Sequence, residues 1–84
     1  PEELQMKAQL GRELRSVIRR RRLTQAKAAI LMGVKQPDVS AIINGKIAKF
    51  SLDRLVRCLD GLDYRVELTV RPKPRKRAPA VAAE

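Results

Sequence analysis

The chain has 84 residues, with 19 Lys or Arg against 9 Asp or Glu, so its formal net charge is +10. This length allows one small domain, and the charge predicts a polyanionic partner, with nucleic acid ahead of an anionic membrane surface. The absence of His and the presence of a single Cys in the sequence exclude an internal disulfide, a Cys–His zinc site and a His-dependent catalytic triad.

The first predicted helix runs from about Glu3 to Arg21. Acidic residues at its start and arginines at its end suit the dipole of a helix. Its apolar residues recur at the spacing of a one-sided helix. These residues are Leu10, Leu14, Val17 and Ile18.

The second predicted helix is short and has a signal at each end. Thr24 is a good N-cap for a helix over Gln25–Met32, because its side chain accepts a hydrogen bond from an unpaired helical N–H. Gly33 ends this helix, because glycine adopts the left-handed conformation that a tight turn requires.

The third predicted helix begins at Gln36, with Pro37 in its first turn, where a missing N–H costs nothing. Asn44-Gly45 closes it. Two short helices joined by a tight glycine turn form a helix-turn-helix, whose second helix can enter the major groove of DNA. Ser51 caps a fourth helix from Leu52 to about Leu59, and Asp60-Gly61 is read as a turn.

The periodicity then changes from helical to alternating. In residues 65–71, Val66, Leu68 and Val70 alternate with polar residues, which predicts a half-buried strand. A lone strand leaves its backbone unpaired, so we expect it to pair with the same strand of a second copy or with another protein's sheet. Residues 72–84 are predicted to be a disordered basic tail, either inert or attracted to phosphates.

The segment Leu23–Lys46 resembles the helix-turn-helix of the Cro/phage-repressor class, also called the XRE type. The matching residues are Gln25, Ala29, Gly33, Val34, Val39, Ile42, Asn44 and Gly45. Lys49–Pro72 is similar to a compact bacterial subgroup in which one strand follows the fourth helix. Many members of that subgroup are antitoxins of type II toxin–antitoxin modules, of the host-inhibition-of-growth kind, which bind a ribonuclease-type toxin and repress their own operon.

The resemblance implies a mainly α fold over residues 1–71. We expect a four- to five-helix bundle with a phage-repressor-like helix-turn-helix and one C-terminal β-strand that pairs across a dimer. The chain departs from the family at Lys35, where Ser or Thr often caps the third helix. Lysine cannot accept the capping hydrogen bond, but it can reach phosphate or guanine.

The resemblance also implies which residues contact DNA. The expected base-reading residues are Lys35, Gln36, Pro37, Asp38 and Ser40. The expected phosphate contacts are Gln25, Asn44, Lys46 and Lys49, with Gln25 and Asn44 open to a purely local role in a first turn and a loop. Asp38 has three possible roles, which are a first-turn helix charge, an acceptor for cytosine N4 and a partner for Lys35.

The sequence therefore predicts a cytoplasmic, sequence-specific transcriptional regulator, without enzymatic activity, cofactor or membrane partner. It would be an autorepressing antitoxin that acts as a homodimer on an inverted-repeat operator in double-stranded DNA and binds a toxin protein. The alternative is a protein-interaction module of the same fold that binds a partner or an anionic surface without reading DNA. The single Cys58 is expected to be a core thiol.

Overall fold

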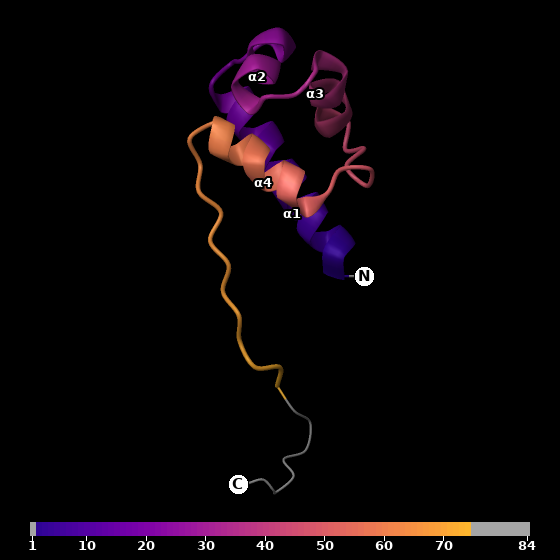
Figure 1. The fold of residues 1–84 in the computed structure, drawn as a ribbon, viewed down its shortest axis with the longest axis vertical. Helices are drawn as coiled ribbons and strands as arrows, with labels where there is room; N and C mark the ends of the chain where they lie inside the picture. Colours follow the sequence, from indigo (N-terminus) through magenta and orange to yellow (C-terminus); the bar gives the residue numbers. More distant parts are fainter. Residues whose placement is uncertain (1, 75–84) are drawn as a thin grey trace, which may run out of the picture.

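The structure, a computed structural model, describes residues 2–74. It contains four helices, which are α1 (Glu2–Arg20), α2 (Gln25–Met32), α3 (Gln36–Ile43) and α4 (Leu52–Gly61). In Figure 1 the long helix α1 and helix α4 lie alongside each other, and α2 and α3 sit together at one end of this pair. The predicted mainly helical fold is confirmed over the described residues, with four helices.

The caps expected from the sequence form at α2 and α4. The Thr24 hydroxyl accepts a hydrogen bond of 3.0 Å from the Lys27 backbone N–H, and the Ser51 hydroxyl accepts one of 3.1 Å from Arg54. Gly33 ends α2 in the left-handed conformation, with φ of 73°. Lys35 precedes α3 without any side-chain cap, as its lack of an acceptor requires.

A single hydrophobic core joins the helix-turn-helix to the other two helices. Val39 and Ile42 of α3 are fully buried, and Ala29 of α2 is nearly so. The remaining core residues come from α1, α2 and α4, from the loop after α3 and from the residue that follows α4, and they are Leu14, Val17, Ile18, Ala28, Met32, Ile47, Phe50, Leu55, Cys58, Leu59 and Leu62. Because one face of α3 is committed to this core, its opposite face is oriented outward.

The end of α4 differs from the sequence-based expectation. Asp60 and Gly61 are not a turn but the last residues of the helix, which extends two residues beyond Leu59. The reason is a close crossing of helices. A Cβ on Gly61 would overlap the Leu31 carbonyl oxygen and lie 3.1 Å from the Met32 Cα, so only glycine allows the end of α4 to pack on the end of α2.

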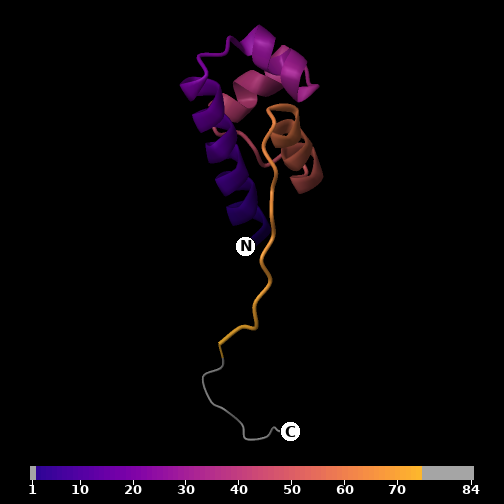
Figure 2. The ribbon, with the colours of Figure 1, turned by 90° about the vertical axis from the view of Figure 1, so that its left-hand side faces the viewer.

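The predicted strand is absent from the described part of the chain. Residues 64–74 are extended but carry no strand, because a strand requires a hydrogen-bonded neighbour and one copy of this chain supplies none. Figure 2 shows the segment leaving α4 and running past the start of α1, along the side of the molecule on which α1 and α4 lie next to each other. The predicted tail falls mostly outside the described residues, of which only 72–74 belong to it.

The start of this extended segment is attached to the end of α1. Arg20 donates a hydrogen bond of 3.3 Å to the Tyr64 hydroxyl, and the Arg21 guanidinium carbon lies 5.3 Å from the centre of the Tyr64 ring. The Tyr64 backbone N–H also donates to the Leu59 carbonyl at 2.9 Å. These contacts set the direction in which the segment leaves the helices. None of the helices formed by residues 2–74 is both long and apolar enough to cross a lipid bilayer.

Candidate nucleic-acid interface

The first turn of α3 presents the residues expected to read bases. Lys35, Gln36 and Pro37 are exposed, whereas Val39 in the next turn is fully buried. This division follows from the helical period, since residues on the core face cannot also face solvent. Three of the five predicted base-reading residues therefore lie together on an accessible surface.

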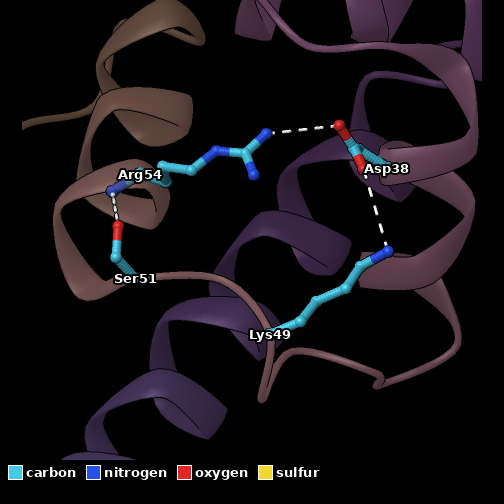
Figure 3. A network of polar contacts seen from close by, with 4 residues as sticks. All are labelled: Asp38, Lys49, Ser51 and Arg54. Atoms are coloured by element: carbon cyan, nitrogen blue, oxygen red, sulfur yellow. Dashed lines mark hydrogen bonds and ion pairs between the residues drawn. The ribbon is translucent and has the colours of Figure 1, made fainter.

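Asp38 is held by two basic residues from outside α3. The Arg54 guanidinium on α4 donates a hydrogen bond of 3.2 Å to one carboxylate oxygen, and the Lys49 Nζ in the preceding loop lies 4.0 Å from the other. Figure 3 shows the Asp38 carboxylate between these two side chains. Of the possible roles of Asp38, the pairing with Lys35 does not occur within residues 2–74, and Asp38 pairs instead with Lys49 in the loop and with Arg54 of α4.

Both cations also lie on the Phe50 ring. The Arg54 guanidinium carbon is 4.9 Å and the Lys49 Nζ is 5.5 Å from the ring centre. A cation above an aromatic face is attracted by its negative π cloud, so the fully buried Phe50 helps to orient both partners of Asp38. These contacts connect α3 to the loop after it and to α4.

Ser40 and Asn44 form a second local group at the end of α3. The Asn44 side-chain amide donates to the Ser40 carbonyl at 2.9 Å and lies 3.5 Å from the Ser40 hydroxyl. Asn44 thus satisfies one of the last helical carbonyls, which is the local role weighed against phosphate contact. Ser40 is only half-buried.

The remaining predicted phosphate contacts flank α3 on both sides. Gln25 is the first residue of α2 and is half-buried, while Lys46 and Lys49 are exposed in the loop between α3 and α4. Between Glu13 and Asp53 the sequence contains one acidic residue, Asp38. The basic residues of the same stretch are Arg15, Arg19, Arg20, Arg21, Arg22, Lys27, Lys35, Lys46 and Lys49.

The stretch from Arg15 to Lys49, which includes the helix-turn-helix, is therefore strongly positive. Its one carboxylate is already engaged by Lys49 and Arg54, so it contributes no unpaired negative charge to the face that carries Gln36. Such a face attracts the phosphates of a nucleic acid.

Sequence reasoning missed Arg54. It is separated from Asp38 by 16 residues and lies on another helix, so no local pattern could indicate the pair. Arg54 also faces Cys58. Burial raises the pKa of the Cys58 thiol, an effect that Arg54 opposes and Asp38 reinforces. The buried thiol belongs to the core, as expected from the sequence.

Changing Asp38 to Asn tests whether this carboxylate keeps Lys49 and Arg54 from binding phosphates. The change frees Lys49 and Arg54 to meet phosphates, so we expect tighter non-specific DNA binding and a salt slope steeper by about 0.9 per added phosphate contact. The loss of stability should stay within about 1 kcal/mol, because the ion pairs are only partly buried. Salt-dependent anisotropy titration with random duplex measures the first effect, and thermal unfolding the second.

Asp63→Asn is the matched control for this change. It alters net charge equally in the turn after α4, where φ is 67° and asparagine is well tolerated. An equal steepening in both variants would show that net charge, and not the pairing of Asp38, controls binding.

Comparison with known proteins agrees with this geometry. A family profile described as a helix-turn-helix domain matches residues 1–71. A solved structure described as a candidate XRE family transcriptional regulator is 47% identical, with a TM-score of 0.82, and the match covers 99% of this chain and 100% of that one. No curated protein matches the chain. The exposed first turn of α3, the packing of α2 on α3 and these two matches together show that the chain belongs to the helix-turn-helix domain family.

Proposed function

We propose that the protein is a sequence-specific, DNA-binding transcriptional regulator that places α3 in the major groove. The observation that carries this proposal is the exposed start of α3, where Lys35 and Gln36 face solvent and the one carboxylate, Asp38, is paired with Lys49 and Arg54. The similarity to an XRE family regulator supports it.

The proposed contacts divide into base reading and phosphate binding. Gln36 can bond adenine N6 and N7, Lys35 can reach guanine O6 or N7, and Pro37 can touch a thymine methyl. Lys46 is proposed to hold a phosphate beyond the end of α3. Asp38 is assigned to positioning α3, because its carboxylate is bound to Arg54.

Gln25, Ser40, Asn44 and Lys49 complete the proposed interface. Gln25 begins α2, where backbone N–H groups and the helix dipole favour a phosphate. Ser40 and Asn44 are bonded to each other, so each would contact DNA while keeping its place at the end of α3. Lys49 would contact both Asp38 and a phosphate.

The finer assignment is an autorepressing antitoxin that acts in the cytoplasm as a two-fold dimer on an inverted repeat. It rests on the resemblance of residues 49–72 to the antitoxin subgroup and on the alternation of Val66, Leu68 and Val70, which we infer to be the dimer strand. Residues 1–71 would form the domain and residues 72–84 a basic tail that adds phosphate attraction.

A second candidate is a protein-interaction module without DNA reading. Exposure of Leu68 and Val70 favours it, because apolar side chains of this size are seldom left in water without a partner. Binding of a protein partner that survives combined substitution of Lys35, Gln36 and Ser40, with no DNA preference in the parent chain, would select this function.

Anisotropy titration against the chain's own upstream promoter and a scrambled duplex, at two salt concentrations, tests the main proposal. We expect a preference for the promoter of at least a hundredfold and affinity that falls steeply with salt. Equal affinity for both duplexes would reject sequence-specific regulation.

A further inference from the structure

The extended segment after Tyr64 leaves both its backbone and its apolar side chains without partners. No backbone hydrogen bond involves residues 65–74 within the described part of the chain. Leu68 is 72% and Val70 83% exposed, although their alternation with polar residues is that of a strand with one buried face. A missing neighbour would account for both features.

An apolar groove lies beside this segment. It has a volume of about 420 Å³ and lies between the first half of α1, helix α4 and the segment itself. Its lining is mostly apolar, with Met6, Leu10, Leu52 and Val56 from the helices and Val66 and Leu68 from the segment, and it also includes Gln9 and Glu67. Leu4 and Met6, near the start of α1, are also exposed. A strand laid against residues 66–70 would therefore cover continuous apolar surface.

The polar residues that alternate with the apolar ones indicate the partner of the segment. In chain order they are Arg65, Glu67, Thr69 and Arg71, and Glu67 and Arg71 lie at equal distances on either side of Thr69. In an antiparallel pair centred on Thr69, Glu67 faces the partner subunit's Arg71, and the same pair recurs on the other side of the axis. Opposite charges in facing positions stabilise an antiparallel pair.

Other registers are less favourable. Centring the pair on Glu67 sets two carboxylates opposite each other, and centring it on Leu68 sets Arg65 against the partner's Arg71. Centring it on Val70 draws Pro72 into the ladder, where proline cannot donate a hydrogen bond. A shift by one residue would place apolar against polar positions.

We propose that two copies of this chain pair through residues 67–71 as an antiparallel ribbon with Thr69 on the two-fold axis, covering the groove between α1 and α4. Leu68 then faces the partner's Val70 at the edge of the groove. This arrangement rests on the dimer proposed above, and it adds the register of the two strands and their position against α1 and α4. It also explains why residues 65–71 form no strand in a single copy.

Cysteine scanning tests the register without DNA. In this ribbon Thr69 faces its own copy at a Cα separation of about 4.5–5.5 Å, within the range for a disulfide. We expect Thr69→Cys to cross-link rapidly on mild oxidation. We expect Leu68→Cys and Val70→Cys to cross-link at least tenfold more slowly, because each of these residues lies diagonally from the same residue of the partner strand. The parent chain is the control, since its single thiol, Cys58, is buried. Fastest cross-linking at residue 68 or 70, or at none of the three, would overturn the proposal.

Charge exchange tests the same register without oxidation. Glu67→Arg and Arg71→Glu should each weaken dimerisation roughly tenfold in sedimentation equilibrium, because each sets like charges opposite one another twice. The double variant should recover parental dimerisation at the parental net charge. Arg71→Glu lowers the net charge, so its weaker dimer could not come from overall repulsion. Failure of the double variant to recover would contradict this register.

These outcomes are separable from failure of DNA reading. A chain that prefers its promoter half-site but neither dimerises nor cross-links would overturn the ribbon and leave the regulator proposal intact. A chain that cross-links at residue 69 but binds all duplexes equally would support the ribbon and reject the regulator.

Discussion

Replacing Gly61 with Ala is expected to lower the melting temperature by roughly 15 °C, which corresponds to about 3 kcal/mol for a domain of this size. The added methyl group would overlap the Leu31 carbonyl oxygen and crowd the Met32 backbone. Backbone atoms cannot rotate away as a flexible side chain can, so α4 must separate from α2. Thermal unfolding followed by circular dichroism at 222 nm measures the effect.

Gly33→Ala is the control for this change. A Cβ at Gly33 meets nothing within 4 Å, so the cost there is only the left-handed backbone with φ of 73°, or about 1–2 kcal/mol. If both variants lost equal stability, backbone strain would explain the result, and the close crossing of α4 on α2 would not be its cause.

Replacing Gln36 with Ala is expected to remove discrimination at one base pair of each half-site. A bidentate contact to adenine contributes about 1–3 kcal/mol of discrimination, so affinity for the preferred operator should fall by roughly 5- to 150-fold. Affinity for an operator already changed at that position should hardly move. Titration of the parent and variant proteins with a set of single-base operator variants locates the position.

Lys46→Ala is the contrasting change for this experiment. The exposed Lys46 carries a charge but is proposed to contact phosphate alone, so its loss should weaken all duplexes alike and reduce the salt slope by about 0.9. A uniform loss in Gln36→Ala as well would remove Gln36 from the base-reading residues.

Much of the fold was predictable because its signals are local. Thr24 and Ser51 cap helices through a bond to an N–H three residues away, and Gly33 ends α2 through its own backbone conformation. The outward position of Gln36 follows likewise from the period of one helix with Val39 on its inner face. Features of this kind need no knowledge of the rest of the molecule.

The errors arose where distant segments meet. Asp60-Gly61 has the composition of a turn, yet both residues belong to α4, and Gly61 is a glycine because the backbone of α2 leaves no room for a Cβ. The sequence allowed three roles for Asp38, and none of them was the ion pair with Arg54, which lies on another helix with its guanidinium over the Phe50 ring. Neither the close crossing nor the ion pair has a signature in spacing along the chain.

The sequence by itself determined the four helices, their caps, the basic character and the helix-turn-helix, because hydrophobic period, capping and charge act over a few residues. Only the tertiary structure decided that Asp38 is neutralised by Lys49 and Arg54, that Gly61 is a packing residue, and that residues 64–74 pass beside α1 and α4 as an extended, unpaired segment. The physical reason is that helix crossings, ion pairs between elements and strand partners depend on distances between residues far apart in sequence.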